Sequence, residues 1–312
     1  MPSPTAQRAA ILRRLVAEGT VPIPGAPLPL VAKLVEREGF PAMYLSGAVL
    51  SAGVHGVPDI GLVTLDDLAR QTRILAAAAD LPLVVDADTG FGGPREVEEC
   101  VRVLEEAGAA AIQIEDQEGA PSGAGGGKRC GHLAGKRVID AGAMCEKIAA
   151  ARAGCRSPDT VIIARTDSRG VAGLDECLAR MAAYRAAGAD WLFPEAPRDR
   201  EEFARLGAEF GTECPLLANM TEFGVGPLLT VDELSELGFA AVLFPVTLLR
   251  VAMQAMHAAL AVIADEGTQS SLLDLMQTRE ELYDLLDYDP ARPEEWIASH
   301  RPPPGRPGAR HP

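Results

Sequence analysis

The chain has 312 residues, 47% of them hydrophobic, and a formal net charge of −15. A chain of this length can bury a full hydrophobic core, as one large domain or as two. The excess of acidic residues argues against general binding to nucleic acids or to anionic membrane surfaces, so an anionic ligand would need cations or a metal concentrated locally.

Targeting and membrane signals are not evident in the sequence. Residues 1–19 carry arginines on an amphipathic pattern and lack the apolar region of a signal peptide. No uncharged apolar run reaches the ~18 residues that a membrane span needs. The six cysteines show neither a C-x-x-C pair nor zinc-ligand spacing. We therefore expect a soluble, cytoplasmic protein with free thiols.

Eight short apolar runs recur along the chain, and each is followed by a helical pattern. They span residues 21–25, 42–47, 83–88, 110–115, 161–167, 191–195, 216–219 and 241–245. Uninterrupted apolar strands are typical of a parallel sheet covered on both faces. Eight strand–helix units within about 250 residues predict an α/β fold, a (β/α)8 TIM-type barrel. A doubly wound open sheet is the alternative, but it usually has fewer strands and no G-x-G-x-x-G follows the first run.

Amphipathic patterns between these runs predict the outer helices. They include residues 95–106, 142–153, 174–187, 231–237 and, for the eighth helix, 248–263. A later helical segment, 270–286, is surplus to a barrel, so we expect it to bury its apolar stripe on another subunit. We predict one domain over 1–298, with exchanged helices at about 264–298. Residues 299–312 are rich in proline and glycine and predict a disordered tail.

A glycine-rich loop at residues 119–127 leads into the sequence Lys-Arg-Cys-Gly-His at 128–132. A thiol between two cations and an imidazole has surroundings that stabilise a thiolate, so Cys130 can exchange a proton near neutral pH. Glycines on the upstream side let such a loop swing over a pocket and away again. The alternative is a surface turn with an incidental cysteine and an ordinary loop histidine, His132.

Carboxylates cluster at the ends of two neighbouring predicted strands. Asp86 and Asp88 lie two apart on one run, so they would project to the same side, and Glu115 ends the next run. Hard oxygen ligands suit Mg²⁺, which uses few protein carboxylates, several waters and the oxygens of a ligand. Each carboxylate by itself could be a helix cap. Together they predict a metal site.

Further polar residues end predicted strands on the face where loops form the active site of a barrel. They are Tyr44, Ser46, Arg165, Asp167, Glu195, Asn219 and Thr221, and Arg250 lies just after the last run. Arg165 and Arg250 can each hold a carboxylate through two parallel hydrogen bonds. In the alternative reading, Arg165 only pairs with Glu195. The Tyr44 hydroxyl is either anchored in the core or catalytic.

Six motifs give the chain a resemblance to a known family. They are Tyr44-Leu-Ser-Gly47, Gly56-Val-Pro-Asp-Ile-Gly61, Asp86-Ala-Asp88, Glu115-Asp-Gln117, Lys128-Arg-Cys-Gly-His132 and Ala164-Arg-Thr-Asp167. Over about residues 39–287 the chain resembles the isocitrate lyase/phosphoenolpyruvate mutase superfamily. Residues 192–196, 219–224, 266–269 and 276–283 make it most similar to the branch that cleaves 2-methylisocitrate.

The resemblance implies a set of site residues and partners. It implies Mg²⁺, with Mn²⁺ as an alternative, held at Asp86 and Asp88 largely through water, with Glu115 nearby. The implied substrate-binding residues are Ser46, Gly47, Ala48, Gly131, Arg165, Asn219, Thr221, Arg250 and Arg279. The implied catalytic residues are Cys130, Tyr44, Lys128, His132 and Glu195. The family further implies a small tricarboxylate substrate, no nucleic-acid or membrane partner, and a homotetramer with helices exchanged between subunit pairs.

The implied reaction is a retro-aldol-type cleavage of (2S,3R)-2-methylisocitrate into pyruvate and succinate, within the methylcitrate cycle of propionate catabolism. A base, which is Tyr44, Glu195 or a metal-bound water, removes the hydroxyl proton, and Cys130 is the general acid. Isocitrate lyase activity differs by one methyl group, worth only ~1–3 kcal/mol of discrimination. A phosphonomutase and a non-catalytic dicarboxylate-binding barrel are further alternatives. Gln113, where many relatives have histidine, and Ala48, where glycine is common, are departures that bear on side-chain specificity.

Overall fold

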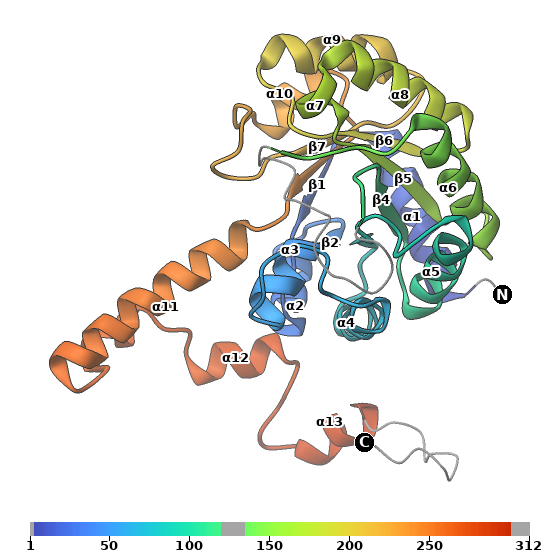
Figure 1. Cartoon of the computed structure of the whole chain (residues 1–312). Helices are drawn as coiled ribbons and strands as arrows, with labels where there is room; N and C mark the ends of the chain where they lie inside the picture. The colour runs from blue at the N-terminus through green and yellow to red at the C-terminus, as the bar shows by residue number, and fades with distance from the viewer. Residues whose placement is uncertain (1–2, 120–134, 301–312) are drawn as a thin grey trace. The chain divides into compact units, whose positions relative to one another are not determined.

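The structure, a computed structural model, describes residues 3–119 and 135–300 and forms two compact units, Met1–Ala255 and Met256–Pro312. The first unit contains eight strands that alternate with helices (Figure 1). The strands are β1 (Val21–Pro24), β2 (Met43–Leu45), β3 (Leu83–Asp86), β4 (Ala111–Glu115), β5 (Val161–Thr166), β6 (Trp191–Pro194), β7 (Leu217–Asn219) and β8 (Ala241–Phe244). Each lies inside one of the eight predicted apolar runs, so the strand prediction is confirmed.

Parallel pairing closes these strands into a barrel. Strands β2 to β6 pair in chain order, and β8 lies between β1 and β7 in a second sheet. Single parallel bridges join the two sheets, from Gly25 to Tyr44 and from Leu192 to Leu216. Every strand therefore has a parallel neighbour on both sides, and the predicted (β/α)8 barrel is confirmed.

Apolar side chains from the strands fill the inside of the barrel. Ile23, Ile163 and Trp191 belong to this cluster and are fully or almost fully buried. Ala9 and Leu12, from helix α1 (Pro4–Glu18), join the same cluster. Helix α1 thus packs on the interior beside residues that begin the strands, which leaves the carboxyl ends of the strands for a site.

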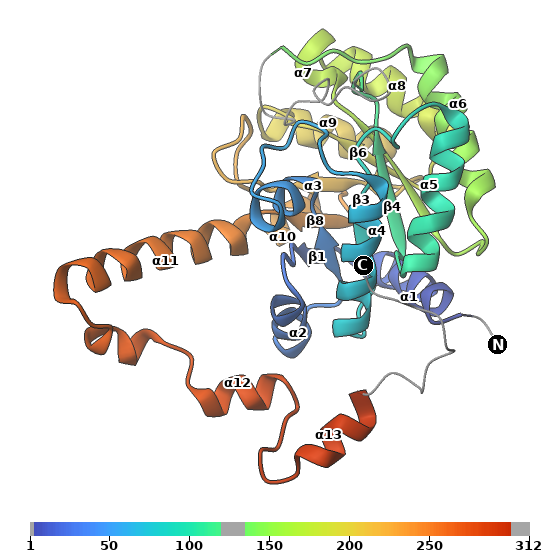
Figure 2. The same ribbon diagram turned by 60° about the horizontal axis from the view of Figure 1, so that its bottom comes forward.

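The remaining helices of the first unit surround the barrel (Figure 2). They are α2 (Pro29–Arg37), α3 (Gly47–Val49), η1 (Leu50–Val54), α4 (Leu65–Ala78), α5 (Pro94–Ala107), α6 (Ala141–Gly154), α7 (Ser168–Ala172), α8 (Leu174–Ala186), α9 (Arg200–Phe210) and α10 (Val231–Glu236), and α11 (Thr247–Glu266) follows β8. Their starts follow from the sequence. Thr64 caps the start of α4 and Thr230 caps the start of α10, each through a reciprocal pair of hydrogen bonds with an acidic residue three positions later. Apolar residues on the inner faces of these helices pack against the outer side of the strands.

The predicted helical segment 270–286 is interrupted in the structure. A 3-10 helix, η2 (Ser270–Leu275), is followed by a separate helix, α12 (Arg279–Leu285), so the prediction of one continuous segment was wrong. The break arises because Thr278 caps α12, with its hydroxyl accepting from the Glu281 backbone at 3.1 Å. In the last helix, α13 (Pro293–His300), the Trp296 indole donates to the Leu286 carbonyl at 3.0 Å. The Trp296 ring also lies edge-on to Tyr288 with 6.1 Å between ring centroids, so capping, this hydrogen bond and aromatic contacts hold the last helices of the second unit.

Helix α11 is unusually apolar for a helix with no buried residue. Across the part of the chain that the structure describes, it is the one helix long and apolar enough to cross a membrane, judged by length and composition alone, with a mean hydropathy of 1.5. That is weak evidence for a span, because exposed apolar side chains such as Val251 and Leu260 equally suit burial against another protein chain. The cytoplasmic location stays a prediction.

Candidate active site

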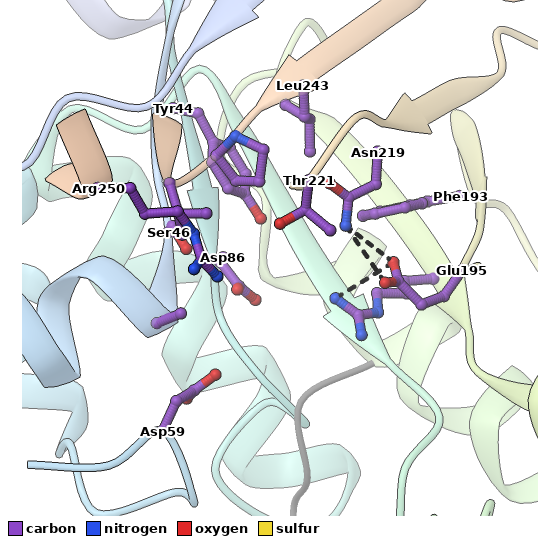
Figure 3. Close-up of a pocket in the computed structure, with 14 residues that line it drawn as sticks. Tyr44, Ser46, Asp59, Asp86, Phe193, Glu195, Asn219, Thr221, Leu243 and Arg250 are labelled. Carbon is purple, nitrogen blue, oxygen red and sulfur yellow. Dashed lines mark hydrogen bonds and ion pairs between the residues drawn. The ribbon is translucent and has the colours of Figure 1, made fainter. Parts of the chain in front are cut away.

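A pocket of about 100 Å³ lies at the carboxyl ends of the strands (Figure 3). Its lining residues are Tyr44, Ser46, Ala48, Asp59, Asp86, Arg165, Phe193, Glu195, Asn219, Thr221, Leu243, Pro245, Val246 and Arg250. Most of them end a strand or directly follow one, at β2, β3, β5, β6, β7 and β8. Closure of the barrel therefore brings into one cavity side chains that are distant in sequence, as expected for this fold.

Asp86 ends β3 and is buried among neutral hydrogen-bond donors. The Gly47 backbone donates to its Oδ2 at 3.2 Å, and the Asp88 backbone to its Oδ1 at 3.2 Å. The Gln113 side-chain nitrogen donates to Oδ1 at 3.1 Å. Among residues 3–119 and 135–300, no lysine or arginine forms an ion pair with Asp86. A buried carboxylate whose charge is not neutralised is costly, so this position favours a cation.

Asp88 lies in the turn after β3 rather than on the strand itself. The strand ends at Asp86, and Asp88 has a left-handed backbone with a φ of 50°. Its carbonyl accepts from the Glu115 backbone at 2.9 Å, and Gly90 closes the turn on Ala87 at 2.8 Å. Strand alternation was therefore the wrong reason to place the two aspartates together, because the chain turns before Asp88.

The magnesium prediction can be compared with this donor set. Among the described residues no group of three histidine, cysteine or acidic side chains is arranged as a metal site. Mg²⁺ nevertheless needs only one or two protein carboxylates, because waters and ligand oxygens complete its coordination. Asp86 fits such a site, since it offers hard oxygens in the pocket and has no cationic partner in that part of the chain. Magnesium binding at Asp86 and Asp88 stays a prediction.

Arg165 is a buried cation held between three carboxylates. Its Nε lies 2.9 Å from Asp167 and 3.3 Å from Glu115, and its Nη1 lies 3.6 Å from Glu195. The guanidinium also stacks over the Phe193 ring at 5.3 Å. Burial disfavours the charge, but Asp167, Glu115 and Glu195 outweigh it and raise the pKa of Arg165. The pairing with Glu195 that was the alternative reading is present, and Arg165 lines the pocket as well.

Asp167 links Arg165 to a second buried cation. Lys136 donates to its Oδ1 at 2.8 Å, beside a 3.2 Å hydrogen bond from Arg165. Burial opposes ionisation, but Arg165 and then Lys136 prevail and lower the pKa of the Asp167 carboxyl to about 2. The Asp167 backbone N–H donates to the Asp116 carboxylate at 2.9 Å, and the Tyr184 hydroxyl also donates to the Asp116 carboxylate, at 2.7 Å. This network, behind the pocket, fixes the end of β5 against the end of β4.

Glu195 and Asn219 form one wall of the pocket (Figure 3). The Asn219 amide donates to both Glu195 oxygens, at 3.2 and 3.4 Å. The buried Oδ1 of Asn219 has no hydrogen-bond partner among the described residues. A buried acceptor of this kind is costly unless a donor reaches it. This wall of the pocket is therefore suited to a ligand hydroxyl, or to a water molecule, that donates a hydrogen bond to Asn219 Oδ1.

Arg250 lies across the pocket from Glu195 (Figure 3). Its Nε is 3.4 Å from Glu222, and its guanidinium lies over the Phe223 ring at 5.4 Å. Thr247 donates to the other oxygen of Glu222. The Arg250 side chain is 50% exposed, so its fork is more accessible to a ligand than that of Arg165, which is 9% exposed.

The predicted residues divide into three groups. Nine of them line the pocket, namely Tyr44, Ser46, Ala48, Asp86, Arg165, Glu195, Asn219, Thr221 and Arg250. Gly47, Asp88 and Glu115 contact those residues without lining it. Lys128, Cys130, Gly131 and His132 lie outside the described residues, and Arg279 begins α12 in the second unit.

Sequence reasoning missed five lining residues. Asp59 was quoted within the 56–61 motif, but it follows no strand and so was not read as a site residue. Phe193 and Leu243 are apolar strand residues, and nothing in an apolar run shows which side chain faces a cavity. Pro245 and Val246 follow β8, where the position of a residue just beyond the strand was the available signal.

Comparison with known proteins gives consistent matches. Residues 12–264 match the family described as phosphoenolpyruvate phosphomutase. A 2-methylisocitrate lyase of Aeropyrum pernix is 47% identical over 279 residues, covering 89% of this chain and 87% of that protein. A probable 2-methylisocitrate lyase 1 of Corynebacterium glutamicum is 45% identical over 283 residues, covering 91% and 90%.

Solved structures agree with these sequence matches. The structure of 2,3-dimethylmalate lyase, a member of the PEP mutase/isocitrate lyase superfamily, has a TM-score of 0.82 at 34% identity and covers 92% of this chain and 93% of its own. A phosphonopyruvate hydrolase solved with oxalate and Mg²⁺ has a TM-score of 0.79 at 25% identity, covering 96% and 99%. The second of these holds the metal predicted here.

We expect Asp167→Asn to lower the free energy of unfolding by about 3–5 kcal/mol at pH 7, because a buried ion pair that loses one partner leaves its cations uncompensated. The folded-state pKa of about 2 lies below the ordinary 3.8, so the carboxylate stabilises the fold above pH 3.8 and this contribution is lost as the pH falls through 2. Urea unfolding should show a difference from wild type that is constant from pH 7 to about pH 4 and smaller at pH 3.

Asp175→Asn is the matched control. Asp175 pairs with Arg205 at 2.6 Å, and its side chain is 86% exposed. Loss of such a surface pair costs below about 1 kcal/mol. Equal effects of the two substitutions would contradict the assignment of Asp167 as the counter-ion of the buried cations.

Proposed function

The chain belongs to the phosphoenolpyruvate mutase/isocitrate lyase superfamily, and from this premise we propose that it is an enzyme that cleaves 2-methylisocitrate into pyruvate and succinate. The single observation that carries the proposal is the 45–47% identity to 2-methylisocitrate lyases over 89–91% of the chain. The pocket agrees with this activity, because it combines two arginines, an aspartate without a cationic partner in the described part of the chain, and neutral donors.

The arginines have different tasks in binding a tricarboxylate. Arg165 commits two of its five N–H donors to Asp167, so it offers the pocket only its remaining donors. One of its other nitrogens pairs with Glu195 at 3.6 Å and orients that carboxylate. Within residues 3–119 and 135–300 Arg250 has one ion pair, to Glu222 at 3.4 Å, and its guanidinium is accessible. We therefore assign the main grip on a substrate carboxylate to Arg250. Ser46, Gly47, Ala48, Asn219 and Thr221 add neutral contacts, and Gly131 and Arg279 complete the proposed binding set.

Asp86 would hold the metal, with Asp88 acting through water and Glu115 nearby. Bound Mg²⁺, or Mn²⁺ in its place, supplies positive charge that stabilises the alkoxide of the substrate and the enolate of pyruvate. The backbone of Gly47 and the amide of Gln113 keep the Asp86 carboxylate in a fixed orientation. A solved relative that holds Mg²⁺ with oxalate supports the choice of metal.

Two proton transfers complete the reaction. A base takes the proton of the substrate hydroxyl as the C–C bond breaks, and an acid protonates the carbon of the succinate half. Cys130 is proposed as the acid, with Lys128 and His132 beside it in sequence. Burial raises the pKa of the Cys100 and Cys177 thiols to about 12 and that of Cys155 and Cys214 to about 11, which leaves these four unsuited to the task.

We expect an assay of succinate, which is released with pyruvate from 2-methylisocitrate and with glyoxylate from isocitrate, to show turnover of 2-methylisocitrate about tenfold or more faster, by kcat/KM, than turnover of isocitrate. Accommodation of one methyl group is worth ~1–3 kcal/mol, and a tenfold change corresponds to about 1.4 kcal/mol. EDTA should abolish both activities, and Mg²⁺ should restore them. Turnover that persists in EDTA, or preference for isocitrate, would contradict the proposal.

Cys130→Ser should lower kcat by at least about a hundredfold, because general acid catalysis contributes 10²–10⁴-fold and a hydroxyl is a much weaker acid than a thiol. Mg²⁺ binding, measured by calorimetry, should be unchanged. Cys214→Ser is the control, since its thiol donates to the Asp190 carbonyl away from the pocket and should leave kcat near wild type. Near-normal turnover of Cys130→Ser would rule out the thiol as the acid.

The oligomeric state is part of the same proposal. We expect a homotetramer in which the helices after residue 264 are exchanged between subunit pairs. Exposed apolar side chains support this, including Met256 and Leu260 on α11 and Leu273 and Leu275 on η2, which are 55–84% exposed in the isolated chain. Apolar surface of this kind is normally covered by another chain.

Light scattering coupled to size-exclusion chromatography, at micromolar protein, should therefore give four times the mass of the chain for the wild-type protein. Leu260→Glu should shift the population towards smaller species, because a charge is costly in an apolar interface. Asp265→Asn, on the same helix, should leave the mass unchanged. A wild-type protein that is monomeric at micromolar concentration would contradict the tetramer.

A further inference from the structure

Gln113 does not line the pocket, but it forms hydrogen bonds with two residues that do. It lies on β4 and is fully buried, between Tyr44 on β2 and Asp86 at the end of β3. The Tyr44 hydroxyl donates to Gln113 Oε1 at 2.9 Å, and Gln113 Nε2 donates to Asp86 Oδ1 at 3.1 Å. All three side chains are at most 6% exposed, so bulk water does not replace these bonds.

The direction of this chain of hydrogen bonds is set by Asp86. An ionised carboxylate only accepts hydrogen bonds, so the amide nitrogen of Gln113 must face it. The opposite amide orientation would place a carbonyl oxygen about 3.1 Å from a carboxylate oxygen, without a proton between them. The amide oxygen must therefore face Tyr44, and it can only accept the phenol proton.

A phenol has one proton, and in Tyr44 that proton is used by Gln113. Any other hydrogen bond to the Tyr44 oxygen must therefore be one that it accepts. Tyr44 lines the pocket together with Asp86 (Figure 3). We infer that Gln113 is a positioning residue that makes Tyr44 a hydrogen-bond acceptor for the hydroxyl group of the bound substrate. This inference rests on the proposed function, because it names the substrate group that Tyr44 recognises.

The same geometry bears on the choice of base. To carry away the hydroxyl proton, neutral Tyr44 would have to pass its own proton on, and the Gln113 amide has no site to receive it. A phenolate at Tyr44 would also add a negative charge close to Asp86. The bond to Gln113 therefore suits Tyr44 to orient the substrate hydroxyl, and it gives the hydroxyl proton no route through Gln113. The proton goes to another group, and Glu195 is the carboxylate across the pocket that can receive it.

Equilibrium binding of two dicarboxylates tests this role. Malate and succinate differ only in the hydroxyl group, and their dissociation constants can be measured by calorimetry on the full chain with Mg²⁺. We expect the wild-type protein to prefer malate by about tenfold, and Tyr44→Phe to reduce that preference to about twofold. Gln113→Met, which keeps the side-chain length but removes both hydrogen bonds, should reduce the preference by a similar factor.

Coupling between the two positions separates positioning from general packing. If Gln113 acts through Tyr44, Gln113→Met should lower the preference no further in a Tyr44→Phe background. Gln113→His should restore the preference at pH 8, because a neutral imidazole has one donor nitrogen for Asp86 and one acceptor nitrogen for Tyr44. The Mg²⁺ dissociation constant, measured for every variant, shows whether Asp86 has been disturbed. In Tyr44→Phe, which leaves the side chains of Asp86 and Gln113 unchanged, it should change by less than about threefold.

Any of three results would overturn the inference. The first is a wild-type protein without a preference for malate, and the second is a preference that survives Tyr44→Phe. The third is a Gln113→Met effect of equal size with and without the Tyr44 hydroxyl. The lyase assay is read separately. A protein that selects malate through Tyr44 and Gln113 but does not cleave 2-methylisocitrate would refute the proposed function and support the inference.

Discussion

The buried charge of Arg165 is the constraint on which the site depends. A guanidinium removed from water is costly, and the structure meets that cost with carboxylates from the ends of three strands: Glu115 on β4, Asp167 after β5 and Glu195 after β6. The ion pairs with Glu115 and Glu195 also fix the end of β5 against the ends of β4 and β6. The ion pairs that stabilise the buried Arg165 charge therefore also hold this wall of the pocket in place.

This arrangement explains how an acidic protein can present a site for an anion. Two of the acidic groups behind the pocket are already paired with cations: Asp167 with Arg165 and Lys136, and Asp116 with Arg180 at 3.2 Å. Their negative charge is neutralised locally, which leaves Arg250 and the position beside Asp86 to determine the sign of the potential that a ligand meets. A net charge of −15 is thus compatible with a trianionic substrate, provided that a metal adds its charge at Asp86.

Hydrogen-bond direction adds a second level of order. Asp86 accepts hydrogen bonds from the Gly47 backbone and from the Gln113 amide nitrogen, and the Gln113 amide oxygen accepts from Tyr44. Each of these groups therefore acts only as a donor or only as an acceptor in its bond. A site built in this way distinguishes a ligand hydroxyl from a ligand carbonyl, which charge alone cannot do. Asn219 Oδ1 on the opposite wall, which has no hydrogen-bond partner in the described part of the chain, can likewise only accept a hydrogen bond.

The sequence by itself determined the class of fold and most of the pocket. Eight apolar runs gave the strands, since a parallel barrel needs uninterrupted burial, and polar residues at their ends marked Asp86, Arg165, Glu195 and Asn219 because strand ends meet on one face. The motifs gave the family. What only the tertiary structure decided is direction and distance: the turn that takes Asp88 off β3, the entry of Asp59 and Leu243 into the lining, and the position of Gln113 between Tyr44 and Asp86. These depend on how neighbouring strands are staggered around the closed barrel, and that stagger is set by packing between residues far apart in the chain rather than by any local pattern.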